Sequence, residues 1–232
     1  MDSRTSLPLL FDDKVSEGGG TQNNISQNNI SQNKISQNNI SQDKISETKT
    51  AELQKLALKV DACKKCLLCN DRKNAVLGEG AISPELLIVG EAPGFFEDQQ
   101  KRPFVGRSGK LLDHLIETCL NMKREDLYIA NVVKCRPKDN RTPTKIEINS
   151  CLVYLNKQVE LLNPKLILTL GNTAFRALVD TDLGITKARN NLYSYRNITL
   201  VPTFHPSAAL RGGKSVVDLM EVDFKKVRSI LG

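Results

Sequence analysis

Residues 85–92 read Glu-Leu-Leu-Ile-Val-Gly-Glu-Ala, and this nearly continuous apolar run decides the fold class of the chain. Three further runs of the same kind follow at residues 127–133, 165–170 and 198–204. Strands that are apolar on both sides are typical of a parallel sheet whose two faces are both covered. We therefore predict four buried, mostly parallel strands.

Helical patterns separate these runs. One covers residues 109–120, and a longer one begins with Thr142-Pro143 as N-cap and first helical position and ends at Asn163-Pro164. Further helices are predicted at residues 51–62 and 216–231. Strands that alternate with helices predict an α/β fold, a three-layer α/β/α sandwich around a central, mostly parallel four-stranded sheet.

Polar clusters stand where the predicted strands end. Gly90 and Glu91 end the first strand, Asn131 ends the second, and His205 follows the last. In an open sheet of this kind, ligands bind beyond the carboxyl ends of the strands. We therefore expect these residues to converge on one rim of the sheet.

The cysteines suggest a metal site. Cys63 and Cys66 form a C-x-x-C pair, and Cys135 and Cys151 follow later. Four thiolates can hold a zinc ion or an iron–sulfur cluster, and the spacing does not choose between them. Separate buried thiols are the alternative, which suits Cys119 on the apolar stripe of its helix. Three of the four paired cysteines lie in Lys/Arg-rich segments instead, which favours a metal.

Charge and hydropathy limit the class of protein. The 232 residues include 33 Lys and Arg against 26 Asp and Glu, for a formal net charge of +7. This excess suits a polyanionic partner such as nucleic acid, although many basic proteins bind nothing acidic. No segment approaches the ~18 consecutive apolar residues of a membrane helix, and the N-terminus lacks a secretory signal. We expect a cytoplasmic monomer without membrane contact, where disulfides are rare.

The first 50 residues differ from the rest of the chain. Residues 21–50 repeat a polar unit of five residues close to Ile-Ser-Gln-Asn-Asn, a period that matches neither a helix nor a strand. This segment has too little apolar surface to offset the conformational entropy that it would lose on folding. We predict a disordered tail over residues 1–50 and a folded domain over residues 51–232.

Three blocks of the folded domain resemble one known family. Residues 90–109 (GEAPGFFEDQQKRPFVGRSG), 131–143 (NVVKCRPKDNRTP) and 205–208 (HPSA) are similar to the signature of family 4 uracil-DNA glycosylases, the iron–sulfur type of bacteria and archaea. The resemblance covers about residues 55–230. It implies a bacterial enzyme of base-excision repair that hydrolyses the N-glycosidic bond of uracil in single- or double-stranded DNA, releases uracil and leaves an abasic site.

The same resemblance implies a cofactor. It assigns a [4Fe–4S] cluster to the paired cysteines, namely Cys63, Cys66, Cys135 and Cys151, and leaves Cys69 outside the pattern. The cluster would hold loops that touch DNA.

The resemblance also implies roles around an extruded uracil. The amide of Asn131 offers a donor and an acceptor for the Watson–Crick edge, and Phe104 offers a flat face for the ring. His205 would stabilise the negative charge that develops on uracil O2. Without the resemblance, Asn131 is equally a strand-end cap, Phe104 a core residue and His205 a structural residue before proline. Gly90 and Ala92 complete the predicted substrate-binding set.

A carboxylate is expected beside the sugar, which becomes oxocarbenium-like as the bond breaks. Glu91 is our first candidate for contacting the uracil or the attacking water. Glu97 is the second, and Asp98 is a third.

DNA contacts are expected from basic side chains near the three blocks, which would neutralise phosphates. The candidates are Arg102, Arg107, Lys134, Arg136, Arg141 and Arg211. Each of them is alternatively an ordinary solvated side chain.

Two further alternatives stay open. The chain could be a non-catalytic iron–sulfur or zinc nucleic-acid-binding module related to phage polymerase-associated domains, although Glu91, Asn131 and His205 together favour the enzyme. Residues 6–11 (Ser-Leu-Pro-Leu-Leu-Phe) are either an incidental apolar cluster or a docking peptide, since they loosely resemble the peptides with which bacterial repair proteins bind the sliding clamp.

Overall fold

The structure is a computed structural model that describes residues 44–232. Within it, Ile45–Gly232 form one compact unit. The docking peptide of residues 6–11 and all but the end of the predicted tail lie outside the described residues.

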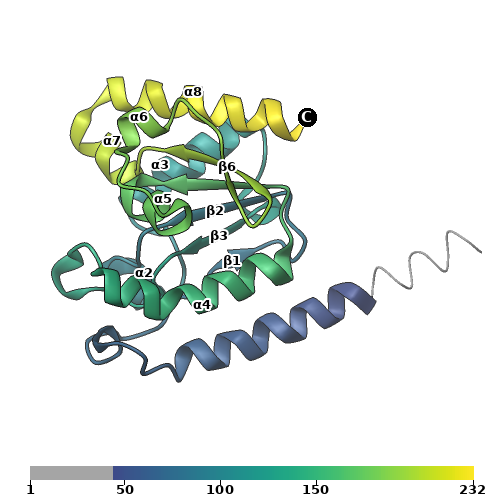
Figure 1. Cartoon of the computed structure of the whole chain (residues 1–232), viewed down its shortest axis with the longest axis vertical. Helices are drawn as coiled ribbons and strands as arrows, with labels where there is room; N and C mark the ends of the chain where they lie inside the picture. Colours follow the sequence, from purple (N-terminus) through teal and green to yellow (C-terminus); the bar gives the residue numbers. More distant parts are fainter. Residues whose placement is uncertain (1–43) are drawn as a thin grey trace, which may run out of the picture. The chain divides into compact units, whose positions relative to one another are not determined.

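A six-stranded sheet forms the centre of this unit, in the order β1-β3-β2-β4-β6-β5 (Figure 1). The four inner strands are parallel to one another and correspond to the four apolar runs. They are β2 (Leu86–Gly90), β3 (Tyr128–Asn131), β4 (Leu166–Leu170) and β6 (Ile198–Thr203). The predicted parallel sheet is therefore confirmed, with slightly shorter strands.

Two edge strands widen the sheet beyond the predicted four. β1 (Glu79–Gly80) pairs antiparallel with β3, and β5 (Tyr193–Tyr195) pairs antiparallel with β6. Neither strand is fully buried, so neither has the apolar run by which the inner strands were identified.

Helices cover both faces of the sheet, which confirms the three layers (Figure 1). One face packs against the helix of residues 44–61, α4 (Lys145–Leu162), α5 (Gly171–Val179) and α6 (Ile185–Ala188). The other packs against α3 (Arg107–Leu115) with its π-helical extension η2 (Ile116–Leu120), α7 (Pro206–Gly212) and α8 (Lys214–Leu231). Short helices occupy connections: η1 (Leu67–Cys69), α2 (Phe95–Gln100), η3 (Arg124–Asp126) and η4 (Lys138–Asn140).

Alternation along β2 explains the two cores. Leu87 and Val89 point into the core beneath α4, whereas Leu86 and Ile88 point into the core beneath α3 and α8. All four side chains are fully buried. A strand with both faces covered needs apolar residues at every position, which is why its sequence reads as a continuous run.

Two helix starts differ from the sequence prediction. The first helix, predicted from residue 51, already includes residue 44, where the described residues begin, and α4 is capped by Thr144 rather than Thr142. The Thr144 hydroxyl accepts a hydrogen bond from the Glu147 amide, and the Glu147 carboxylate accepts one from the Thr144 amide at 2.8 Å. This capping box needs an acid three residues after the cap, which Thr144 has and Thr142 lacks. The predicted end of α4 is confirmed, because Asn163 adopts the left-handed conformation there.

None of the helices in residues 44–232 has the length and apolar character that crossing a membrane requires.

The core beneath α8 gives a stability prediction. Replacing the fully buried Phe224 with alanine should lower the free energy of unfolding by about 3–5 kcal/mol, because it removes apolar contacts and leaves a cavity. Val222→Ala on the same helix is the control, since Val222 is 59% exposed and should change stability by less than about 0.5 kcal/mol. Urea unfolding of both variants checks this, and equal effects would contradict the packing described for α8.

Candidate active site and thiol cavity

A cleft of about 700 Å³ opens beyond the carboxyl ends of the parallel strands. Six of the residues predicted to act on a ligand line it together: Glu91, Ala92, Glu97, Phe104, Asn131 and His205. They come from four separate segments of the chain. The parallel register brings them together, because strands that run the same way end at the same rim.

Gly90 lets two of the cleft residues, Asn131 and Phe104, approach its backbone closely. A Cβ at Gly90 would lie 2.4 Å from Asn131 Oδ1 and 2.5 Å from Phe104 Cζ. Gly90 pairs with Asn131 in the register of β2 and β3. A side chain at position 90 would therefore push away both the amide and the ring.

The Asn131 carboxamide is buried without a partner for its oxygen. The residue is 2% exposed, and Oδ1 accepts no hydrogen bond from any described residue. A buried acceptor that stays unpaired costs about 1–3 kcal/mol. Since Asn131 lines the cleft, a ligand with an N–H or O–H donor would satisfy this oxygen.

Phe104 is held by Glu97. Its backbone lies in the left-handed region, with φ of 51°, which is rare for an aromatic residue. Glu97 Oε1 accepts hydrogen bonds from the next two amides, Val105 at 2.9 Å and Gly106 at 3.0 Å. The Phe104 ring lies 5.7 Å from the His205 ring, centroid to centroid. Glu97 thus fixes the loop that presents the ring to the cleft.

His205 is the N-cap of α7, and its protonation follows from its contacts. Nδ1 accepts a hydrogen bond from the Ser207 amide at 3.1 Å and lies 2.8 Å from the Ser207 hydroxyl. Nδ1 is therefore an acceptor, and the neutral ring carries its proton on Nε2. Burial, with the positive charge of Arg211, lowers the pKa of His205 to about 4. The ring is thus a neutral donor at physiological pH.

The three acidic candidates lie in different surroundings. Glu91 lines the cleft and is half-buried. Glu97 also lines it, but Oε1 is occupied by backbone amides. Asp98 is outside the lining, because its carboxylate accepts from the amides of Lys73 and Asn74 at 3.0–3.1 Å. Asp98 therefore holds residues 73 and 74 in place. Glu91 and Glu97 are the acidic candidates that line the cleft.

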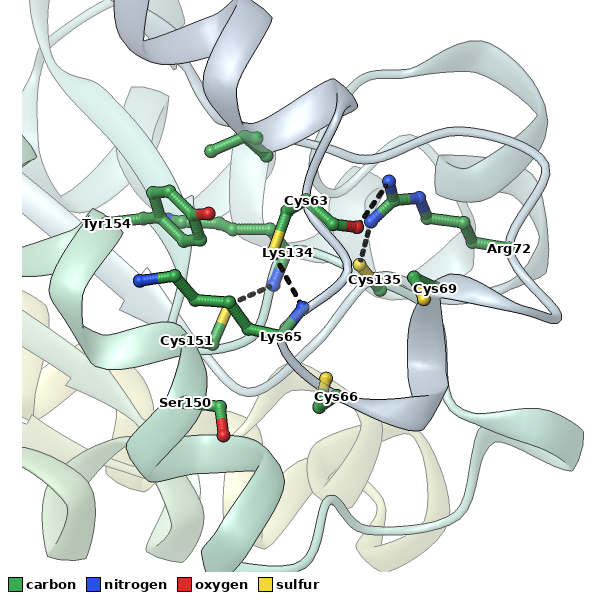
Figure 2. A pocket seen from close by; sticks show the side chains of 11 residues that line it. Cys63, Lys65, Cys66, Cys69, Arg72, Lys134, Cys135, Ser150, Cys151 and Tyr154 are labelled. Carbon is green, nitrogen blue, oxygen red and sulfur yellow. Dashed lines mark hydrogen bonds between the residues drawn. The ribbon is translucent and has the colours of Figure 1, made fainter.

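The cysteines surround a second cavity, away from the cleft (Figure 2). Cys63, Cys66, Cys69, Cys135 and Cys151 line it, from three segments of the chain. All six cysteines of the protein are free thiols. Burial raises the pKa of Cys135 to about 11 and also raises the pKa of Cys66 and Cys151. A bound metal is what would hold such buried thiols as thiolates.

N–H groups point at three of these sulfurs. Arg72 donates to Cys135 Sγ at 2.8 Å, the Lys134 amide donates to Cys151 Sγ at 3.2 Å, and the Lys65 amide donates to Cys63 Sγ at 3.4 Å (Figure 2). Hydrogen bonds to sulfur are a recurring feature of iron–sulfur sites. In residues 44–232, no three His, Cys, Asp or Glu side chains converge closely enough to hold one metal ion. Four thiolates are a donor set that either a zinc ion or an iron–sulfur cluster can use.

The basic residues predicted to contact DNA divide into two groups. Lys134 is wrong as a surface contact, because it is 1% exposed. Arg102 and Arg141 are exposed but form ion pairs with Glu79 and Glu147, at 2.7 Å each. The second group consists of Arg107, Arg136 and Arg211, of which Arg136 also donates from Nε to Asn140 Oδ1 at 2.8 Å. Arg211 lines the cleft, Arg107 is exposed at the start of α3, and the Arg136 guanidinium lies 5.1 Å from the Phe95 ring.

Several lining residues were not identified from the sequence. Gly171, Asn172 and Thr173 directly follow β4 and line the cleft. A Cβ at Gly171 would lie 3.0 Å from His205 Cβ, so this glycine lets the imidazole approach. The strand-end rule applied to the third apolar run would have found this segment. Ser207 lies in the 205–208 segment that resembles the family signature, but no role was predicted for it.

Known proteins are similar to this chain over most of its length. Residues 77–228 match the uracil DNA glycosylase superfamily. Relatives named type-4 uracil-DNA glycosylase occur in Sulfurisphaera tokodaii (42% identity, 77% of this chain and 84% of that protein) and Saccharolobus solfataricus (43%, 77% and 86%). A third, in Thermotoga maritima, is 42% identical over 75% of this chain and 91% of that protein.

The lowered pKa of His205 predicts a pH dependence of stability. Unfolded histidine has a pKa of about 6.5, so between pH 6.5 and 4 the unfolded state binds a proton that the folded state does not. The contribution of His205 is therefore complete above pH 6.5 and is lost as the pH falls to 4, by about 3 kcal/mol.

The measurement is the free energy of unfolding of the protein and of His205→Gln at pH 7 and pH 4.5. The variant should lose less stability on acidification than the wild type. Parallel losses would contradict a buried neutral imidazole.

Proposed function

The chain belongs to the uracil-DNA glycosylase superfamily and excises uracil from DNA in base-excision repair, and from this premise we propose how its cleft performs the excision. The enzyme hydrolyses the bond between uracil N1 and the deoxyribose C1′, which releases uracil and leaves an abasic site. The base must first leave the stack and enter the cleft. The roles proposed for the cleft residues concern uracil bound in this cleft.

The unpaired oxygen of Asn131 is the observation that carries this proposal. Uracil has a donor at N3 and an acceptor at O4, and a carboxamide matches both through Oδ1 and Nδ2. Cytosine has an acceptor at N3 and a donor at position four, so it would leave both amide atoms unpaired in a buried site. Such mismatches allow strong discrimination. Gly90 permits this contact, and Phe104 and Ala92 enclose the ring.

His205 is proposed to stabilise the departing uracil. As the N1–C1′ bond breaks, its electron pair moves into the base and negative charge gathers on O2. The proton on Nε2, fixed by the Ser207 contacts on the other nitrogen, suits a donor to that oxygen. The low pKa keeps this donor neutral, so the base leaves as an anion stabilised by hydrogen bonding.

Glu91 is proposed as the carboxylate beside the sugar. A water adds to C1′ from the opposite side, and Glu91 orients that water and takes its proton. Glu97 is the second candidate, with only Oε2 available because Oε1 binds two amides. This favours Glu91 for the chemistry and Glu97 for holding Phe104.

DNA is proposed to lie across the rim, with Arg107, Arg136 and Arg211 near its phosphates. Phe95 and Phe96 extend this surface, since they are 49% and 55% exposed. Exposed aromatic rings beside arginine suit stacking on bases of an opened strand. The non-catalytic alternative is not favoured, because binding alone does not require a histidine donor and carboxylates in one cleft.

We propose a [4Fe–4S] cluster on Cys63, Cys66, Cys135 and Cys151. Three of these sulfurs accept N–H hydrogen bonds, which suits thiolates. The Cys69 thiol instead donates to Asn70 Oδ1 at 3.4 Å, which suits a protonated bystander. The cluster, when bound, supplies a rigid cross-link among three segments, and the residues of the cleft carry out the excision.

The cellular setting is also a proposal. Free thiols and a DNA substrate support a cytoplasmic location, and the bacterial source rests on the family resemblance alone. A monomer suffices because the described residues supply every proposed role. Residues 6–11, which lie outside the described residues, are proposed as a peptide that docks on the sliding clamp.

The proposed role of His205 predicts a loss of excision. His205→Gln should reduce kcat on a uracil-containing oligonucleotide by about 10²–10³-fold, because the flexible carboxamide lacks the Ser207 contacts that fix the imidazole donor in place. His114→Gln is the matched control, since His114 is exposed on α3. Abasic product is measured by alkaline cleavage. Equal activity of both variants would contradict the role of His205.

The proposed cluster predicts a chromophore. Purified protein should be brown with broad absorbance at about 400 nm, and Cys151→Ser should lose both colour and iron. Cys69→Ser and Cys119→Ser should retain them, because these thiols are not proposed ligands. Zinc in place of iron, or loss of iron in Cys69→Ser, would contradict the assignment.

A further inference from the structure

Lys134 is a buried lysine that lies between the cleft and the thiol cavity. It is 1% exposed and follows Asn131 by three residues, directly before Cys135. Its side chain folds back to donate from Nζ to the Asn131 main-chain carbonyl at 2.8 Å and to Gln158 Oε1. Its own amide donates to Cys151 Sγ at 3.2 Å. One residue thus contacts both the uracil-reading segment and a proposed cluster ligand.

We propose that Lys134 is a positioning residue for uracil recognition, whose ammonium group holds the main chain of Asn131 in place against α4. This inference rests on the proposed function of the cleft. It gives a buried lysine a specific task, namely to support the strand end that carries the uracil reader.

The contacts of Lys134 support this proposal. Its ammonium group has two acceptors, the Asn131 carbonyl and the Gln158 amide oxygen. Burying a charged or polar group is costly unless it is hydrogen-bonded, so the buried lysine is held to these two partners.

The hydrogen bonds of Gln158 support the proposal further. Gln158 is fully buried on α4, and its Nε2 donates to the Leu77 carbonyl at 3.0 Å and the Tyr128 hydroxyl at 3.2 Å. These bonds orient Oε1 toward Lys134. The Lys134 carbonyl in turn accepts from the Val76 amide at 2.7 Å. The ammonium group therefore joins the end of β3 to α4 and to the 76–77 segment.

The Asn131 main chain needs this support because its side chain has none. The carboxamide oxygen is unpaired within the described residues and touches Gly90. Its position against uracil is set by the backbone that carries it. Displacement of a binding group by 1 Å can cost about 100-fold in rate, so a small shift at Asn131 would weaken recognition.

The test is Lys134→Met, which keeps the length of the side chain and removes its charge and donors. Lys65→Met is the matched control, because Lys65 lines the same cavity but is exposed, with Nζ 5.5 Å from the Tyr154 ring centroid. Iron content, kcat and KM on uracil-containing DNA, and hydrogen–deuterium exchange of residues 128–134 are measured for both. Exchange reports on the strand end independently of activity.

Lys134→Met should raise KM at least about tenfold, the size expected for losing hydrogen bonds from a charged group, with kcat changed much less. Exchange in residues 128–134 should become faster at unchanged iron content. The pH profile should stay as in the wild type, because His205 is untouched. Lys65→Met should match the wild type throughout.

An unchanged KM in iron-loaded Lys134→Met would overturn the proposal. If Lys134→Met loses iron or does not fold, Gln158→Leu decides instead, since it removes one acceptor of Lys134, together with the Nε2 bonds to Leu77 and Tyr128, and leaves every cysteine in place. It should raise KM in the same direction with iron retained, and a wild-type KM there would overturn the proposal. A wild-type protein without iron or without uracil excision would overturn the proposed function itself.

Discussion

The parallel pairing of β2 with β3 places Gly90 opposite Asn131, and the candidate site depends on this register. Hydrogen bonds continue the pairing past the strand ends, from the Val132 amide to the Gly90 carbonyl and from the Val133 amide to the Glu91 carbonyl. The pairing keeps the Asn131 carboxamide and the Phe104 ring against a residue without a side chain. A slip by one residue would turn Asn131 toward the opposite face.

Hydrogen bonds hold side chains of the site in place, whereas the Asn131 side-chain oxygen has no hydrogen-bond partner among the described residues. Glu97 fixes the Phe104 loop, and Ser207 fixes the His205 ring. The Asn131 oxygen is left without a partner in residues 44–232. The proposed cluster and Lys134 would extend this support behind Asn131. On this account the cluster contributes to recognition through geometry, while Glu91 and His205 act on the bond that breaks.

Much of this arrangement was predictable because it follows from patterns that burial imposes on sequence. The four inner strands are apolar on both faces, so they were found as continuous runs, and their polar ends indicated the rim. The edge strands β1 and β5 are short and partly exposed, so they left no such pattern. Thr142 and Thr144 are both followed by helix-compatible residues, and only the capping box with Glu147 separates them.

Lys134 shows where sequence reasoning fails at the level of one side chain. A lysine between Asn131 and Cys135 in a basic segment suggests a phosphate contact, and only the packing shows that it is buried.

The central claim, that Asn131 reads the uracil edge, is tested most directly by a crystal structure of the protein with uracil and abasic DNA. We expect uracil N3 within hydrogen-bond distance, about 3 Å, of Asn131 Oδ1, with O2 facing His205 Nε2. A uracil bound elsewhere, or an Asn131 oxygen paired with the protein, would contradict the account.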